Sequence, residues 1–357
     1  MWIRPIPKAV PQRYPIVALS PPYPGNRVKT TTKVSSSAME ATGTDSDGRE
    51  FKSAQEMWRE QAGDDPQKTQ WYREGVAYWE GVEASVDGVL GGFGQVNDAD
   101  IKGSEAFLNS LLHERFSDAG RNQHLVALAS HRWKTSYHDL MGKHGWWMVY
   151  TGGMWSTILP LLKEEEEKKV VSIKGKDCGS GIGRITKNLL IRYFNEVDLL
   201  EPVSHFLDAA RESLSQEHFV ASDVHKATNF YCVPLQEFTP DAGRYNVIWI
   251  QWCIGHLTDD DFISFFKRAK VGLKPGGFFI LKENIARNGF VLDKEDRSIT
   301  RSDLYFKDLF RQCGLHLYKM KDQKGLPQEL FAVKMYALTT EAPKRVDKTR
   351  NRPTIVQ

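Results

Sequence analysis

A glycine-rich segment is the first part of this sequence whose residue types and spacing could bind a ligand. It reads Asp177-Cys-Gly-Ser-Gly-Ile-Gly-Arg184, with glycines at 179, 181 and 183. A glycine-rich turn between a strand and the start of a helix lets a ligand approach the backbone closely, because no Cβ atoms stand in its way. Asp177, before the first glycine, could hold a cationic group of the ligand or fix the loop.

An acid at the end of the next apolar run supports a nucleotide-like ligand. Glu201 lies 24 residues after Asp177 and follows the short segment 196–200. In open α/β sheets a carboxylate at this place binds the two ribose hydroxyls of a nucleotide. An ordinary turn without a ligand is the alternative, because a glycine pattern alone is weak evidence.

The segments around this loop alternate between strands and helices. Short apolar runs predict buried strands at 196–200, 230–233, 246–250 and 277–282, with helices predicted at 182–193, 203–214 and 262–273. The last two strands, at 315–319 and 330–338, look antiparallel. This order predicts an α/β fold with a doubly wound, mostly parallel seven-stranded sheet of Rossmann-like type, preceded by an N-terminal helical cap.

Composition and charge indicate how the rest of the chain is organised and which partners it has. Residues 1–38 contain six Lys or Arg and no acid, which is typical of a disordered tail or an organelle transit segment. We expect five parts: a disordered or transit-like extension (1–50), a helical part with the start of the core (51–128), an insertion (129–176), the core (177–340) and a disordered tail (341–357). The net charge of +3 and the lack of a long apolar run argue against nucleic acid and membrane. The four cysteines form no CxxC pair, so we expect reduced thiols and no metal site.

Several segments together resemble a known family. They are 78–92, 177–187, 235–240, 245–259, 282–284 and 292–296, and the string Ile-Gln-Trp-x-Ile-Gly-His at 250–256 is the most specific. The chain resembles the alpha-N-terminal protein methyltransferases from roughly residue 68 to 338, except for 129–176. The resemblance implies a class I methyltransferase fold, S-adenosyl-L-methionine as cofactor, and methylation of the α-amino group of proteins that begin with Xaa-Pro-Lys or a similar motif. It also implies a monomer found in cytoplasm and nucleus, although residues 1–38 leave organelle targeting open.

The resemblance also implies roles for individual residues. The implied cofactor contacts are Gly179, Arg184, Glu201, Pro202, Val203, Leu235, Gln236 and Gln251. The implied catalytic residues are Asp296 and His256, as candidate bases, and Asn284, which orients the amine. The implied substrate contacts are Trp79, Leu90, Gly91, Trp252, Asp293 and Ser298. Two positions depart from the family, because Glu201 replaces a common Asp and Phe331 replaces a Tyr near the peptide channel.

The chemistry explains why such residues are needed. A free α-amine titrates near pH 8, so at pH 7 it is mostly protonated and has no lone pair for attack. The site must therefore accept a proton and orient the amine. Trp252 could pack on the substrate proline, and Asp293 or Asp296 could pair with the lysine that follows it. Each assignment has a structural alternative: a structural histidine, a solvated charged loop, a core tryptophan or a turn-capping asparagine.

The residues before the glycine loop interrupt the resemblance. A strand-like run ends at Leu128, and joining it directly to Asp177 would restore the expected strand and loop. We therefore interpret 129–176 as an insertion that perturbs the site. Either 125–128 keeps its place as the strand, or 170–173 replaces it, although Lys174 and Lys176 should fit poorly into a buried central strand. The alternatives for function are a small-molecule methyltransferase, or a cofactor-binding protein whose catalysis the insertion impairs.

Overall fold

The computed structural model describes residues 38–66, 68–116, 172–215 and 225–342. Its main feature is a seven-stranded sheet with the strand order β10-β11-β7-β6-β3-β4-β5. The strands are β3 (Lys174–Cys178), β4 (Glu196–Leu200), β5 (Lys226–Tyr231), β6 (Tyr245–Gln251), β7 (Leu273–Ile285), β10 (His316–Asp322) and β11 (Ala332–Thr339). β3 to β7 are parallel, whereas β11 pairs antiparallel with both β7 and β10. The predicted α/β fold with a mostly parallel seven-stranded sheet is confirmed.

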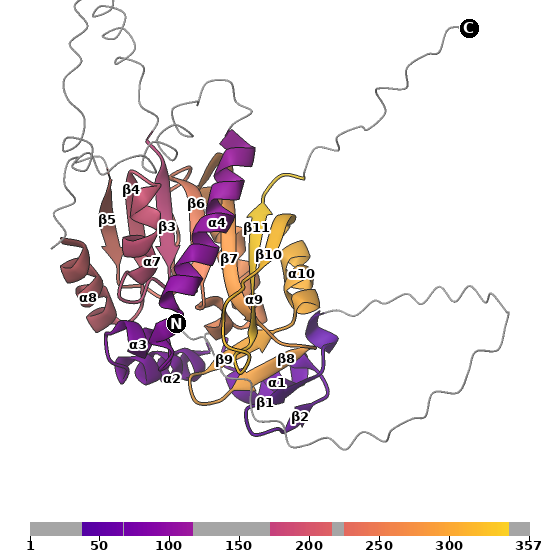
Figure 1. The fold of residues 1–357 in the computed structure, drawn as a ribbon. Helices are drawn as coiled ribbons and strands as arrows, with labels where there is room; N and C mark the ends of the chain where they lie inside the picture. The colour runs from indigo at the N-terminus through magenta and orange to yellow at the C-terminus, as the bar shows by residue number, and fades with distance from the viewer. Residues whose placement is uncertain (1–37, 67, 117–171, 216–224, 343–357) are drawn as a thin grey trace, which may run out of the picture.

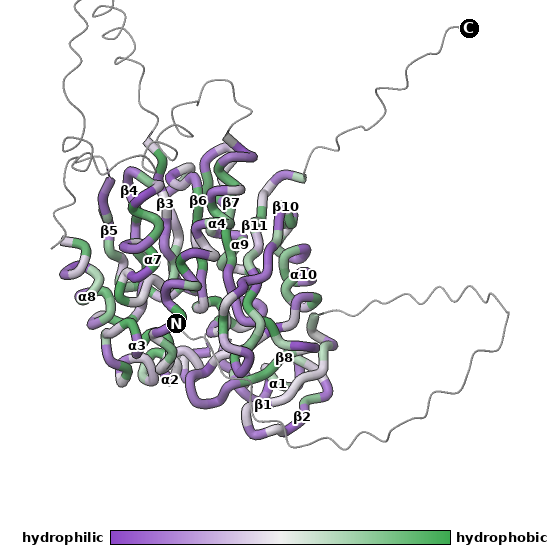
Figure 2. Tube along the Cα trace, in the orientation of Figure 1, coloured by the Kyte–Doolittle hydropathy of each residue, from purple (hydrophilic) through white to green (hydrophobic). Residues whose placement is uncertain are grey.

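Helices cover both faces of this sheet (Figure 1). Val247 and Trp249 of β6 belong to a core cluster shared with α4 (Asn97–Phe116), α7 (Arg184–Asn188) and α8 (Ser204–Ser215). Ile248 and Ile250 belong to a second cluster, shared with α9 (Asp259–Ala269) and α10 (Asp303–Gln312). Successive strand residues point to opposite faces, so both faces of β6 must be apolar. Figure 2 shows this as mainly hydrophobic colouring along β6 and β7.

The N-terminal part adds helices and a second sheet. The helices are α1 (Ala54–Ala62), α2 (Thr69–Glu80) and α3 (Val86–Val89), and the second sheet has the order β2-β1-β8-β9. Its strands are β1 (Gly43–Asp45), β2 (Glu50–Phe51), β8 (Phe290–Asp293) and β9 (Ser298–Arg301). Within the described residues no helix is long and apolar enough to cross a membrane.

The prediction that residues 1–50 are disordered is wrong for residues 38–50. β1 pairs in parallel with β8, and the backbone N–H of Ala38 donates a hydrogen bond of 2.7 Å to Asp308. Gly43 is needed at this contact, because a Cβ atom there would overlap the Phe290 ring. An exposed edge strand offers unpaired backbone groups, and β1 satisfies those of β8. The predicted transit-like residues 1–37 and the tail 343–357 lie outside the described residues.

The strand that leads into the glycine loop is Lys174–Cys178, so residues 174–176 belong to the core sheet and not to an insertion. The expectation that the two lysines would keep this segment out of the central sheet is wrong. Lys176 is fully buried, and its ammonium lies 4.0 Å from the Tyr231 ring centroid and 4.3 Å from that of Phe238. Aromatic faces attract a cation, which offsets part of the cost of burying it. The other predicted strand, 125–128, lies outside the described residues.

Candidate active site

A large cavity lies where the glycine loop leaves β3. Six of the eight predicted cofactor residues line it: Gly179, Glu201, Pro202, Val203, Leu235 and Gln236. Arg184 and Gln251 are not among its lining residues and lie in a neighbouring buried network. The cavity also includes Trp79, Trp252 and His256, which come from α2 and from the segment after β6. The parallel sheet brings these segments together because ligands bind at the carboxyl ends of its strands.

Glu201 organises the glycine loop. Its Oε2 accepts a hydrogen bond of 2.8 Å from the backbone N–H of Gly181, and its Oε1 accepts one of 3.1 Å from that of Val203. Burial raises the pKa of Glu201 above its ordinary value. Gly179 has φ +64°, and a Cβ atom there would overlap that of Cys253. Since each carboxylate oxygen accepts more than one hydrogen bond, Glu201 can hold the loop and still accept from a ribose.

Asp177 ties the loop to α7. The Oγ1 hydroxyl of Thr186 donates a hydrogen bond of 2.7 Å to Asp177 Oδ2. Burial raises the pKa of Asp177 to about 7. Asp177 thus fixes the loop to α7 through Oδ2, whereas its buried Oδ1 has no hydrogen-bond partner among the described residues, so the other predicted role, holding a cationic group of the ligand, stays a prediction.

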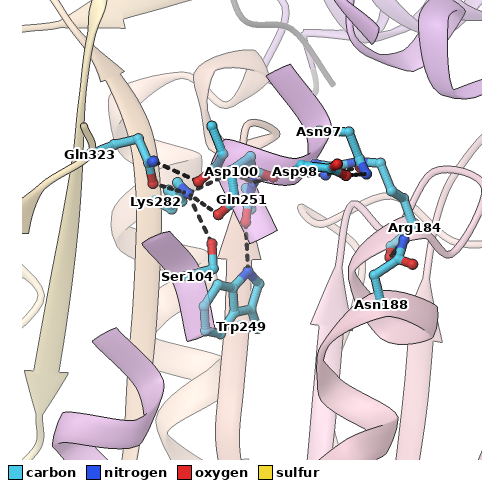
Figure 3. A network of polar contacts seen from close by, with 11 residues as sticks. Asn97, Asp98, Asp100, Ser104, Arg184, Asn188, Trp249, Gln251, Lys282 and Gln323 are labelled. Atoms are coloured by element: carbon cyan, nitrogen blue, oxygen red, sulfur yellow. Dashed lines mark hydrogen bonds and ion pairs between the residues drawn. The ribbon is translucent and has the colours of Figure 1, made fainter. Parts of the chain in front are cut away.

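Arg184 begins a buried polar network that Figure 3 shows. Its Nη1 donates to Asp100 Oδ2 at 2.7 Å and to Asn97 Oδ1 at 3.0 Å. Its Nε and Nη2 are buried and have no hydrogen-bond partner among the residues that the structure describes. Buried N–H groups without partners are costly, so these two are suited to an anionic ligand group. The carboxylate of the S-adenosylmethionine amino-acid part is such a group, and the loop residues around the cavity fit its adenosine part.

Asp100 is the centre of this network, although the sequence analysis gave it no role. It forms ion pairs with Lys282 and Arg184 and accepts from Gln251 Nε2 at 3.0 Å. Burial alone would raise the pKa of Asp100, but the two cations more than offset this and hold its pKa below the ordinary value. Gln251 also accepts a 3.0 Å hydrogen bond from Trp249, so its amide is engaged inside the protein. Gln251 therefore lies next to the predicted cofactor contact Arg184 and supports it through Asp100.

A second, smaller cavity holds all three predicted catalytic residues. His256, Asn284 and Asp296 line it with the predicted substrate contacts Trp252 and Ser298. Asn284 and Asp296 are buried, at 3% and 2% exposure, and come from β7 and from the turn after β8. Because Trp252 and His256 line both cavities, the two cavities meet at these side chains.

His256 is held by hydrogen bonds at both ring nitrogens. Nδ1 lies 3.0 Å from the carbonyl oxygen of Arg297, and Nε2 lies 3.2 Å from the indole nitrogen of Trp79. A carbonyl can only accept and an indole N–H can only donate, so Nδ1 carries the proton and Nε2 accepts. The Nε2 lone pair is thus directed at Trp79, which makes Asp296 the better placed of the two candidate bases.

Trp252 combines a strained backbone with an unsatisfied donor. It has φ +51°, which is rare for a bulky side chain, and it is 3% exposed. Its indole N–H has no hydrogen-bond partner among the described residues. Strain of this kind concentrates at functional sites. Trp252 therefore separates the two cavities, and the surrounding structure holds it in this strained conformation.

The remaining predicted substrate residues, Leu90, Gly91 and Asp293, are not among the lining residues of either cavity. Leu90 is buried in one cluster with Trp79 and Trp252, and Gly91 follows it with φ +63°. Asp293 is half-buried, and its Oδ1 accepts hydrogen bonds from the N–H groups of Glu295 (2.8 Å) and Asp296 (3.4 Å). Asp293 thus shapes the turn that presents Asp296. Phe331, where the family has Tyr, is buried directly before β11.

Two residues at the site escaped the sequence analysis. Glu283 lines the smaller cavity, and its Oε1 accepts a hydrogen bond of 2.9 Å from the backbone N–H of Asn284. Asp100 could have been noticed, because it begins a helical stripe of buried positions that continues at Ser104, Phe107, Leu108 and Leu111. A carboxylate on the buried face of a helix must be paired with a cation. An acid among apolar positions on that face therefore predicts a buried ion pair.

Comparison with known proteins agrees with this site. A family described as "AdoMet dependent proline di-methyltransferase" matches residues 67–131 and 155–339. "Alpha N-terminal protein methyltransferase 1" of Arabidopsis thaliana is 62% identical over 89% of this chain and all of the relative. "N-terminal Xaa-Pro-Lys N-methyltransferase 1" of Xenopus tropicalis is 33% identical over 76% of this chain and 96% of the relative.

A solved structure agrees as well. It is a Leishmania major protein titled a SAM-dependent methyltransferase of the DUF858 family, with 32% identity and a TM-score of 0.62. The alignment covers 89% of this chain and all of that one. The glycine loop, the two adjoining cavities and these matches lead to one conclusion: the chain belongs to the family of S-adenosylmethionine-dependent proline di-methyltransferases, to which it was expected to belong.

Proposed function

We propose that this enzyme transfers a methyl group from S-adenosyl-L-methionine to the α-amino group of proteins that begin with Xaa-Pro-Lys or a similar motif. The observation that carries the proposal is the meeting of the two cavities at Trp252 and His256. The larger cavity has the glycine loop and Glu201 of a cofactor site. The smaller one has a carboxylate and an amide, the groups that an amine acceptor needs.

Methyl transfer requires a neutral amine in line with the donor. When bound, the cofactor supplies a methyl group on a positively charged sulfur. Asp296 accepts a proton from the substrate ammonium, which frees the nitrogen lone pair. The side-chain carbonyl of Asn284 accepts from the remaining N–H and orients the amine toward the larger cavity. Because both side chains are buried, their interactions with the amine act in a low dielectric and are stronger than in water.

The walls of the smaller cavity suit a proline followed by a cation. Trp252 offers a flat apolar surface to the proline ring. Asp293, which does not line the cavity but holds the turn that presents Asp296, offers its carboxylate to the lysine. Trp79 and Leu90 cover the peptide N-terminus from the helical part of the chain. The names of the two relatives, one for α-N-terminal and one for Xaa-Pro-Lys methylation, support this choice of substrate.

A peptide assay tests the proposal. The purified chain is incubated with labelled cofactor and a Ser-Pro-Lys peptide, and with the same peptide acetylated at its amino group. We expect label only on the free amine. Transfer to small metabolites instead would favour a small-molecule methyltransferase. Cofactor binding without any transfer would favour a chain whose catalysis the segment before β3 impairs.

We further propose a monomer in cytoplasm and nucleus. The basic, acid-free residues 1–38 leave an organelle address as the competing possibility. Imaging a fluorescent fusion of residues 1–38 distinguishes the two, because a transit segment would carry the fusion into plastids or mitochondria.

A further inference from the structure

The N-terminal strands lie against the turn that carries the substrate carboxylates. β1 pairs with β8 from Gly43 to Asp45, and the N–H of Ser46 donates a hydrogen bond of 2.8 Å to the carbonyl of Leu292 (Figure 1). β8 ends one residue later, at Asp293, and the turn that follows it contains Asp296. Residues 38–51 lie outside the part of the chain that matches the family, 67–131 and 155–339. This contact therefore lies outside the segments that the family model matches.

Lys294 lies inside that turn, between the two acids in sequence. Its ammonium is 3.1 Å from Asp45 Oδ2 and also forms an ion pair with Asp47. The Lys294 side chain is 41% exposed, whereas that of Asp45 is 1% exposed. Asp45 Oδ1 accepts the N–H groups of Asp47 (3.0 Å) and Arg49 (2.9 Å), so its carboxylate has a fixed direction. The lysine is thus drawn to the β1 side of the turn.

We infer that Asp45 and Asp47 are positioning residues that set the preference for a cation at the third position of the substrate. They hold the Lys294 ammonium away from Asp293, where it would compete with the substrate lysine for the same carboxylate. A lysine directly after Asp293 can turn its ammonium toward that carboxylate by a change of rotamer, because its four-carbon stem is flexible. This inference rests on the proposed function.

The test compares peptides that differ in one charge. Asp45→Asn/Asp47→Asn removes both charges that hold Lys294, and the amide oxygen introduced at position 45 can still accept the two backbone N–H groups. We expect KM for a Ser-Pro-Lys peptide to rise about three- to fivefold, as for the loss of one partly exposed ion pair, with kcat unchanged. KM for a Ser-Pro-Gln peptide should stay as in the wild type. Adding Lys294→Met to the double variant should restore the wild-type preference.

A matched control removes two charges elsewhere. Asp208→Asn/Glu114→Gln breaks exposed ion pairs with Arg211 and Lys319, on α8 and at the end of α4, and should leave the preference unchanged. Asp47→Asn alone changes a side chain that is 71% exposed and should fold normally, with a smaller loss in the same direction.

Two results with the variants would overturn the inference: an unchanged preference for lysine over glutamine in the double variant, or a loss that Lys294→Met does not restore. Equal activity of the wild type on both peptides would overturn it too, while leaving amine methylation intact. A wild-type chain that methylates neither peptide contradicts the proposed function itself, and this is seen before any variant is made.

Discussion

The indole N–H of Trp79 donates a hydrogen bond of 3.2 Å to Nε2 of His256. The same helix, α2, supplies a second indole, because Trp71 donates to the carbonyl oxygen of His256 at 2.8 Å. Two tryptophans of the N-terminal part thus fix one histidine of the core, one at its ring and one at its backbone. The proposed cover over the peptide site and the histidine of the smaller cavity are therefore joined as one hydrogen-bonded unit.

Trp79→Phe tests this unit, because it removes the N–H donor and keeps an aromatic ring at this buried position, although the phenyl ring is smaller than the indole. The loss of one buried hydrogen bond costs about 1 kcal/mol, so we expect kcat/KM for the peptide to fall about fivefold. Steady-state kinetics with a Ser-Pro-Lys peptide measures this. Tyr78→Phe, on the same helix, is the control. A Trp79 variant with wild-type kcat/KM would show that the bond to His256 has no part in turnover.

Asp296→Asn separates catalysis from cofactor binding. The amide has the shape of the carboxylate but cannot accept the amine proton, so we expect kcat to fall on the order of 10²- to 10⁴-fold. Asp296 does not line the larger cavity, so the cofactor Kd from calorimetry should stay within about twofold. Turnover close to that of the wild type would move the role of base away from Asp296.

Asn284→Ala should also lower peptide turnover, and an unaffected rate would leave Asn284 a structural role.

The parallel sheet and the glycine loop could be predicted because periodicity and glycine spacing are local signals. The placement of Lys176 and Asp100 could not, because both depend on side chains distant in sequence. Lys176 is accommodated by the rings of Tyr231 and Phe238, and Asp100 by cations from α7 and β7. Residues 43–45 were predicted to be disordered, because a three-residue strand is too short to show an alternating pattern of apolar residues. Its pairing with β8 is visible only in the structure. Arg184 stays a predicted cofactor contact, and the structure adds that Asp100 and Asn97 hold its guanidinium in place.

Asp100→Asn tests how strongly the network in Figure 3 depends on its central charge. The variant leaves Lys282 and Arg184 buried without their carboxylate, so we expect a loss of about 3 kcal/mol in the free energy of unfolding. Adding Lys282→Met removes one uncompensated cation and should recover part of this loss. Urea denaturation of the four proteins in this cycle gives the coupling. Strict additivity of the two substitutions would contradict a direct Asp100–Lys282 interaction.

Two deletions test which part of the segment before β3 is needed for cofactor binding. Residues 132–154 lie between the two parts that match the family, so we predict that their removal leaves the cofactor Kd within about threefold. Removal of 129–176 also takes away Lys174 to Lys176, the first half of β3, and should abolish cofactor binding. Calorimetry on both proteins measures this. Equal behaviour of the two deletions would contradict the place of β3 in the sheet.

Lys176→Met should stabilise the protein in a way that depends on pH. Burial lowers the pKa of Lys176 to about 8, below its ordinary 10.5. Between these values the unfolded chain binds more protons than the folded one, so the contribution of Lys176 to stability grows as pH rises through that window and is lost as pH falls through it. At pH 7 the buried cation therefore destabilises the fold, and Lys176→Met should gain on the order of 1–3 kcal/mol in the free energy of unfolding. By about pH 10.5, the ordinary lysine pKa, that gain should have largely disappeared.

Lys174→Met is the matched control, because Lys174 lies on the same strand but is partly exposed and pairs with Glu196 at 2.7 Å. Its substitution should change stability by less than about 1 kcal/mol at either pH. Urea denaturation at pH 7 and near pH 10 measures both variants against the wild type, and shared titrations of other groups cancel in the differences. A Lys176→Met gain that is the same at both pH values would show that packing, and not the buried charge, sets the cost of lysine in β3.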